Sequence, residues 1–233
     1  MKRISGFGPN ESRIIVSLCD YSGNWPKPFS DAGYTVLLFD LKHGDDVIEY
    51  RKVIGAIINV MNSFAIYGDT PEIVGIMAAP VCTDFSVSGA QYWEAKDADG
   101  RTALSLALVD GCLAVINYFD QCENLEFWVL ENPVGWLPKL RPGLKSWWWG
   151  YFQPHDYAGW LEDPRAEAYT KKTGLWGRFE GFRQFEKSVP PIRSCSQGSW
   201  IQKLGGKSEK TKELRSKTPL GFARAFFEAN KGE

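Results

Sequence analysis

Three stretches of the chain decide its fold: EIVGIMAAP at residues 72–80, ALSLALVDGCLAVINYFDQC at 103–122 and EFWVLENP at 126–133. The first and third are short apolar runs that end at a proline, which predicts buried strands. The second is long enough to form a helix and joins them. A strand, a connecting helix and a second strand form a parallel pair, so the centre of the chain predicts a βαβ unit.

The alternation of strand and helix continues toward both ends of the chain. Further strands are predicted at RIIVSLC (13–19), YTVLLFD (34–40) and TGLWGRF (173–179), with an amphipathic helix over 47–67. This order favours an α/β fold, with a mostly parallel, twisted sheet and helices on both faces. In such sheets ligands bind beyond the carboxyl ends of the strands, near the point where the strand order reverses.

The end of the chain differs in composition from the strand and helix segments before it. Residues 203–217, KLGGKSEKTKELRSK, are too polar for a core and predict a loop that is mobile or ordered by a ligand. Residues 218–230, TPLGFARAFFEAN, predict a closing helix with Thr218 as N-cap and Pro219 at the first helical position.

Composition indicates a soluble globular protein. The hydrophobic share is 44% and the charged share 24%, and no apolar run reaches the roughly 18 residues of a membrane span. The first residues also lack the apolar run of a signal peptide, so we expect a cytoplasmic protein. Five cysteines without a CxxC pair and only two histidines predict neither a metal site nor a disulfide framework.

Charge and aromatic residues are unevenly distributed. Residues 139–217 contain 16 Lys and Arg against 8 Asp and Glu, although the whole chain has a net charge of −1. Within 136–160 the aromatic residues are Trp136, Trp147, Trp148, Trp149, Tyr151, Phe152, Tyr157 and Trp160. Bases stack on aromatic rings and cations hold phosphates, which indicates a nucleic-acid surface. A solvated basic face, with the tryptophans in a core or a subunit interface, is the alternative.

Cys82 is the first candidate for chemistry. PVCTDFSVSG, residues 80–89, places it in a polar loop directly after a predicted strand. A thiol in such a loop can reach a substrate, and helix N-termini or cations nearby lower its pKa from about 8.5. Cys19, Cys112 and Cys122 lie in apolar runs and are interpreted as structural.

Glu131 and Asn132 are the second candidate, because they end the neighbouring predicted strand. A carboxyl group in a partly buried pocket can stay protonated near neutral pH and donate a proton to a ring nitrogen. The tripeptide E-N-P alone is a weak signal. A strand-end cysteine one strand earlier makes the combination specific.

These motifs resemble those of the DNA cytosine-C5 methyltransferases, most closely the short phage-type members. PVCTDFSVSG resembles that family's P-C-Q-x-F-S-x-x-G nucleophile loop, and LENP resembles its E-N-V strand end. SLCDYSGNW is similar to the cofactor loop D-L-F-x-G-x-G, and SKTPLGFARAFF to the closing helix. The resemblance implies a Rossmann-like class I methyltransferase fold, S-adenosylmethionine as cofactor and DNA as partner.

The resemblance also implies roles for individual residues. Cys82 is the nucleophile, Glu131 the acid and Asn132 a residue that positions the loop, while Lys172 stands for the first arginine of the family's Q-N-R-x-R element. The residues implied to bind the cofactor are Asp20, Tyr21, Ser22, Gly23, Asn24, Trp25, Asp40, Asp45 and Pro80.

Several positions depart from the family pattern. Tyr21 stands where the first cofactor-loop glycine is expected, Val81 replaces the second proline, and Pro133 replaces the valine. The second arginine of Q-N-R-x-R falls on Gly174. A solvated pair is the other interpretation of Lys171 and Lys172.

The expected organisation follows from these assignments. Residues 1–135 form the cofactor-binding and catalytic domain, 136–217 a basic, Trp-rich substrate-binding region, and 218–233 a helix that packs back on the first. About forty residues, 178–217, are too few for an ordinary target-recognition domain. The alternatives are a relative that adds another group to C5 or uses another donor, a catalytically silent binding protein and, more remotely, a thiol hydrolase.

Overall fold

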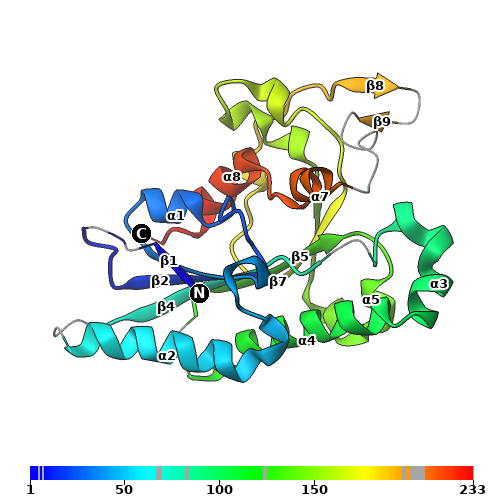
Figure 1. Cartoon of the computed structure of the whole chain (residues 1–233). Coiled ribbons are helices and arrows are strands. Elements are labelled where there is room, and N and C mark those ends of the chain that lie inside the picture. Colours follow the sequence, from blue (N-terminus) through cyan, green and yellow to red (C-terminus); the bar gives the residue numbers. More distant parts are fainter. Residues whose placement is uncertain are drawn as a thin grey trace.

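The computed structural model describes residues 1–4, 6, 8–66, 70–81, 84–122, 125–195, 198–199 and 208–232. Its strands are β1 (Lys2–Ile4), β2 (Arg13–Leu18), β3 (Thr35–Phe39), β4 (Glu72–Ala78), β5 (Phe127–Pro133), β6 (Trp148–Phe152), β7 (Thr173–Arg178), β8 (Arg193–Cys195) and β9 (Gly198–Ser199). Its helices are α1 (Lys27–Asp31), α2 (Tyr50–Ile66), α3 (Trp93–Ala98), α4 (Arg101–Cys122), α5 (Leu137–Leu140), α7 (Glu209–Ser216) and α8 (Leu220–Asn230) (Figure 1). Short 3₁₀ helices, among them Leu41–His43 and Pro142–Trp147, fill several connections.

Seven strands form one sheet in the order β1-β3-β2-β4-β5-β7-β6. The central strands β3, β2, β4 and β5 are parallel, as predicted, whereas β1, β7 and β6 pair antiparallel to their neighbours. The α/β fold is confirmed, and the sheet is mixed, with a parallel centre. The region 136–217 supplies β6 and β7 to this same sheet.

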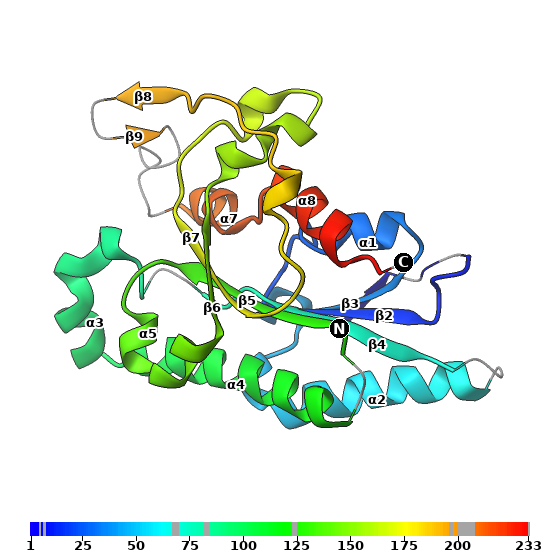
Figure 2. The same ribbon diagram turned by 180° about the vertical axis from the view of Figure 1, so that it is seen from behind.

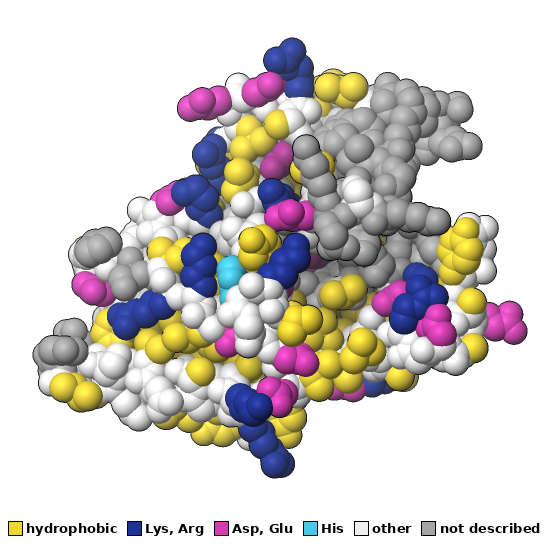
Figure 3. Space-filling model, viewed as in Figure 1, with side chains coloured by type: hydrophobic (Ala, Val, Ile, Leu, Met, Phe, Trp, Pro, Cys, Tyr) yellow, Lys and Arg dark blue, Asp and Glu magenta, His cyan; other side chains and the backbone are white. Residues whose placement is uncertain are grey.

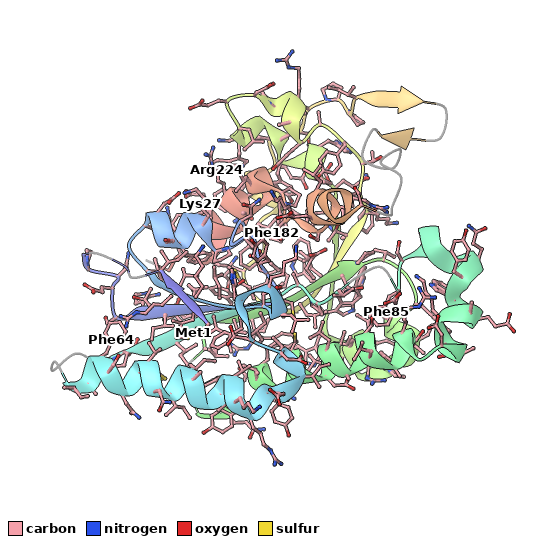
Figure 4. The ribbon with its side chains drawn as sticks, viewed as in Figure 1. Met1, Lys27, Phe64, Phe85, Phe182 and Arg224 are labelled. Atoms are coloured by element: carbon pink, nitrogen blue, oxygen red, sulfur yellow. The ribbon has the colours of Figure 1, made fainter. Side chains whose placement is uncertain are left out.

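Helices cover both faces of the sheet, as the alternation of elements predicted. Helices α2 and α4 lie along one face, and α1 and α8 lie on the other (Figures 1 and 2). Phe64 and Phe85 belong to the core on the α2 side, and Phe182 belongs to the core on the α8 side (Figure 4). Because the parallel strands are buried on both faces, β3 (TVLLF) is apolar and fully buried.

Helix α4 is the central core helix. Among the described residues, Arg101–Gln121 is the one segment long and apolar enough to cross a membrane by length and composition. Its side chains Val109, Cys112 and Ile116 are buried in the core that α4 shares with α2 and the sheet. A core helix of a soluble protein meets the same criteria, so the finding is weak evidence for a membrane span.

Two predictions near the end of the chain are wrong. Residues 209–216, predicted to lie in a loop, form helix α7; residues 203–207 of that segment lie outside the described residues. Thr218 is not the N-cap of α8, since Pro219 takes that position without a side-chain hydrogen bond. Instead, the Glu167 carboxylate accepts from the backbone N–H groups of Leu220 (2.6 Å) and Gly221 (2.9 Å). A distant carboxylate thus satisfies the first donors of the helix, which no local sequence pattern reveals.

Candidate active site

The strand order reverses between β2 and β4. From β2 the chain continues to β3 on one side, and from β4 it continues to β5 on the other. The crevice beyond the carboxyl ends of these strands is where α/β sheets bind ligands. Asp20, Asp40, Pro80 and Glu131 follow or end the four parallel strands, so all four lie at this edge of the sheet.

Glu131 is a buried carboxyl group with only 7% of its surface exposed. Burial raises its pKa above the ordinary value; the positive charge of Lys171 opposes the rise, and the negative charge of Asp20 adds to it. Asp20, two residues after β2, and Lys171, two residues before β7, therefore both act on the Glu131 carboxyl group in β5. The raised pKa favours a protonated carboxyl that can donate a hydrogen bond.

Asn132 links the end of β5 to the loop after β4. Its side chain is completely buried, and its Nδ2 donates to the Pro80 carbonyl at 3.1 Å. Cys82, the predicted nucleophile, and Thr83 lie outside the described residues. Asn132 therefore holds the backbone at Pro80, two residues before Cys82.

The far end of the same loop is also anchored. Asp84 is buried, accepts from Ser105 Oγ of α4 at 2.6 Å and pairs with Lys96 of α3 at 3.2 Å. The next residue, Phe85, is fully buried, and its carbonyl accepts from the Trp136 backbone N–H at 2.9 Å. The described residues before and after Cys82 are therefore both held by contacts, Pro80 by Asn132 of β5 and Asp84 by Ser105 of α4 and Lys96 of α3.

Asp20 shapes the loop after β2. Its carboxylate accepts from Ser22 Oγ (2.7 Å) and from the Gly23 backbone N–H (2.9 Å). Burial raises the pKa of Asp20, and these hydrogen bonds partly offset that rise. Gly23 has φ +66°, in the left-handed region, where glycine carries no steric penalty. The buried Asp20 carboxylate therefore fixes the conformation of the loop through its hydrogen bonds to Ser22 and Gly23.

A cavity of about 290 Å³ opens beside this loop. Its lining residues are Lys2, Tyr21, Ser22, Asn24, His43, Glu213 and Lys217. The Tyr21 ring, 41% exposed, lies 5.0 Å from the His43 ring, and the Lys42 ammonium lies 4.7 Å from the Tyr21 ring centre. On this face of the molecule Lys and Arg side chains gather between α7 and the first loops, with acidic side chains near them (Figure 3).

Several of the other predicted cofactor residues do not line this cavity. Asp40 follows β3 and accepts from the Lys42 backbone N–H at 2.8 Å, and Asp45 pairs with the Met1 amino group. Neither lines the cavity. The Trp25 ring points away from it, because it is fully buried against Phe222 and Phe226 of α8.

Of the two lysines before β7, Lys171 faces the predicted acid. Lys171 Nζ donates to the Arg215 carbonyl of α7 at 3.0 Å, and its charge acts on Glu131. Lys172, the residue predicted from the sequence, is exposed, with its ammonium 4.0 Å from the Tyr151 ring centre. Neighbouring residues along an extended chain point to opposite sides, so the sequence alone could not tell the two lysines apart.

The Trp-rich segment 136–160 divides between core and surface. Trp149 stacks on Phe182 at 4.6 Å, and Phe152 and Tyr157 are buried. Trp147, Trp148 and Tyr151 remain 43%, 43% and 45% exposed. The core interpretation is therefore confirmed for Trp149, Phe152 and Tyr157, whereas a nucleic-acid surface over the exposed rings stays a prediction.

No protein-family model matches the chain, and no curated protein matches it at a significant level. Functional inference therefore rests on the chemistry and geometry of the site itself.

Proposed function

We propose that the protein is a DNA cytosine-C5 methyltransferase that modifies a flipped or single-stranded cytosine, with Cys82 as nucleophile and Glu131 as acid. The observation that carries the proposal is the buried Glu131. Its raised pKa suits a proton donor, and β5 lies beside β4, whose carboxyl end leads into the Cys82 loop. The parallel centre and the strand reversal are compatible with a Rossmann-like class I methyltransferase fold.

Cytosine C5 is a poor nucleophile, so the ring must first gain electron density. In the proposed mechanism the Cys82 thiolate forms a bond to C6 while Glu131 donates its proton to N3. The resulting enamine carries its electron pair at C5, which would take the methyl group of S-adenosylmethionine as the methyl carbon–sulfur bond breaks and S-adenosylhomocysteine leaves. Loss of the C5 proton then returns electrons to the ring and breaks the bond between Cys82 and C6. Because C6 is enclosed in a duplex, the base must be flipped out or supplied unpaired.

The cavity beside the β2 loop is the place that we propose for the cofactor of this reaction. S-adenosylmethionine supplies an electrophilic methyl group. The cavity is close to the smallest ligand pockets, roughly 300 Å³, and carries charges of both signs on Glu213 and Lys217, which suits an amino acid moiety. Ser22 and Asn24 offer polar groups in its lining. Asp40, which follows β3 and lies outside the cavity lining, is the proposed acceptor for a ribose hydroxyl.

Trapping a covalent complex tests the proposal. Purified protein is incubated with S-adenosylmethionine and single-stranded or duplex DNA that contains 5-fluorocytosine, and the adduct is located by peptide mass spectrometry. We expect an adduct on Cys82 that Cys82→Ala abolishes. The control variant Cys112→Ala changes a buried cysteine of the core and should keep the adduct.

Nucleoside mass spectrometry on unsubstituted DNA identifies the product. We expect 5-methylcytosine, which requires Cys82. A different C5 substituent would indicate a relative that uses another group or donor. An absence of both adduct and product with either form of DNA would overturn the proposal in favour of a binding protein that does no chemistry.

A further inference from the structure

Three exposed aromatic rings lie along one stretch of the chain. Trp147, Trp148 and Tyr151 keep 43–45% of their surface exposed, although each contacts the sheet region. The Trp147 ring lies 5.1 Å from Trp128, the Trp148 ring lies 5.0 Å from Trp176, and Tyr151 carries the Lys172 ammonium. We call Trp147, Trp148, Tyr151 and Lys172 the β6 platform.

The strand register makes the platform continuous. Tyr151 pairs with Gly174 across β6 and β7, and the Trp148 ring covers Gly174, where an added Cβ would come within 2.8 Å of it. The Trp147 ring contacts Trp128 and the Trp148 ring contacts Trp176, and both of these partners belong to the core on the α2 face of the sheet. The platform therefore follows one face of the sheet edge, and β6 is the outermost strand (Figure 2).

The same register joins the platform to the proposed site. Gly174, which pairs with Tyr151, pairs on its other side with Asn132, the residue that holds the Pro80 carbonyl. Two strand spacings separate Tyr151 from Asn132, which is roughly 10 Å. A stacked strand of DNA rises roughly 3.4 Å per nucleotide, so about three nucleotides cover that distance.

The charge around the platform suits a polyanion. No Asp or Glu occurs between Asn132 and His155 or between Ala168 and Phe179, the segments that contain β6 and β7. In the part of the chain that the structure describes, Arg141 and Arg178 pair with aspartates, whereas Lys145 and Lys172 form no ion pair with a carboxylate. These two exposed lysines are therefore available to phosphates.

We propose that the β6 platform binds single-stranded DNA and leads it to the Cys82 loop. The inference rests on the proposed function, because DNA is the substrate there, and it specifies the strand state. Exposed rings with cations beside them are the elements of sequence-tolerant single-strand binding. A duplex stacks its bases on each other, so their faces are not available to Trp148 and Tyr151. The rival explanation is a dimer in which a second copy of the chain packs against the β6 edge, because that contact would bury the same rings.

Binding to oligothymidine tests the inference separately from chemistry, because thymine strands contain no cytosine. Fluorescence anisotropy of a labelled oligothymidine and of its duplex with oligoadenine is measured without cofactor. We expect tighter binding of the single strand, and affinity about tenfold weaker in Trp148→Ala and in Tyr151→Ala, the loss typical of one stacking ring. Tyr118→Ala, which removes a ring 40% exposed on α4, is the matched control and should bind like wild type.

Each outcome separates the inference from the proposed function. Cys82 adducts together with unchanged oligothymidine binding in both platform variants would overturn the platform and keep the methyltransferase. Ring-dependent binding without adducts would keep the platform and overturn the methyltransferase. Because Trp148 also covers Trp176, circular dichroism checks that each variant is folded. If Trp148→Ala does not fold, the binding result of Tyr151→Ala alone decides the test. A wild-type dimer by light scattering that becomes monomeric in Tyr151→Ala and binds no oligothymidine would assign the rings to a second copy.

Discussion

Two parts of the crevice at the carboxyl ends of the parallel strands differ in structure. We call them the β4–β5 corner, which contains Glu131 and Asn132, and the β2–β3 corner, which contains the loop around Tyr21. At the β4–β5 corner, Glu131 and Asn132 are buried, and hydrogen bonds hold Pro80 and Asp84, described residues before and after Cys82. At the β2–β3 corner, Tyr21 and its neighbours line an open, polar cavity beneath α7. A proton donor needs a dry, fixed setting that holds its pKa high, whereas a cofactor must enter and leave. The difference matches the division of labour that we propose.

The largest test of this comparison is Glu131→Gln, which keeps the shape of the side chain and removes its proton. We expect the rate of methyl transfer to fall by about 10²–10⁴, the usual contribution of general acid catalysis. Single-turnover measurements at saturating cofactor report this step directly. Equal rates for Glu131→Gln and wild type would exclude Glu131 as the acid.

The same variant predicts a pH dependence of stability. The pKa of Glu131 is higher in the folded than in the unfolded chain, so its stabilising contribution is complete below the unfolded pKa and is lost as pH rises through the folded pKa. A glutamine has no such loss. The Tm of Glu131→Gln relative to wild type should therefore increase with pH, which thermal unfolding between pH 5 and pH 8 measures. A difference that does not change with pH would contradict the raised pKa.

The second test removes the hydrogen bond between Asn132 and the Pro80 carbonyl, which we call the clamp, at the same corner. Asn132→Ala leaves the buried Pro80 carbonyl without its donor, which costs about 1–3 kcal/mol of folding stability. It should also slow formation of the Cys82 adduct, because the start of the loop is released. Asn10→Ala is a matched control, since Asn10 donates to the Ala32 carbonyl at 3.0 Å away from the site. If both variants form the adduct at the wild-type rate, the clamp has no role in chemistry.

The third test moves to the β2–β3 corner. Asp20→Ala removes the acceptor for Ser22 and Gly23, so we expect S-adenosylmethionine to bind about tenfold more weakly by calorimetry. It also removes a negative charge that raises the pKa of Glu131, so the pH above which activity falls should move downward. Asp46→Ala, which removes a similar cap from the Ile48 N–H, should change neither quantity. A tenfold loss in both variants would indicate general loosening of the fold.

The sequence predicted some parts of the structure and missed others. The apolar strand runs predicted the parallel centre, and the polar residues after them predicted that Asp20, Pro80 and Glu131 lie at one edge of the sheet. It did not predict β6, whose aromatic residues do not alternate with polar ones and whose pairing shifts register between Trp148 and Gly150. Contacts between distant segments were also out of reach, such as Lys171 with Arg215 of α7. They depend on tertiary packing, which leaves no local pattern.

The smallest expected effect concerns Tyr21, which stands where the resemblance predicts glycine. Its ring lies on the rim of the cavity and contacts His43 and Lys42, exposed interactions worth about 1 kcal/mol each. If the cavity is already open, Tyr21→Ala changes the Kd for S-adenosylmethionine by less than about tenfold and leaves the adduct rate unchanged. If the ring instead blocks a close approach of the cofactor to the backbone, Tyr21→Ala binds more than about tenfold more tightly. The open and polar β2–β3 corner favours the first result, since Ser22 and Asn24 line the cavity beside the ring.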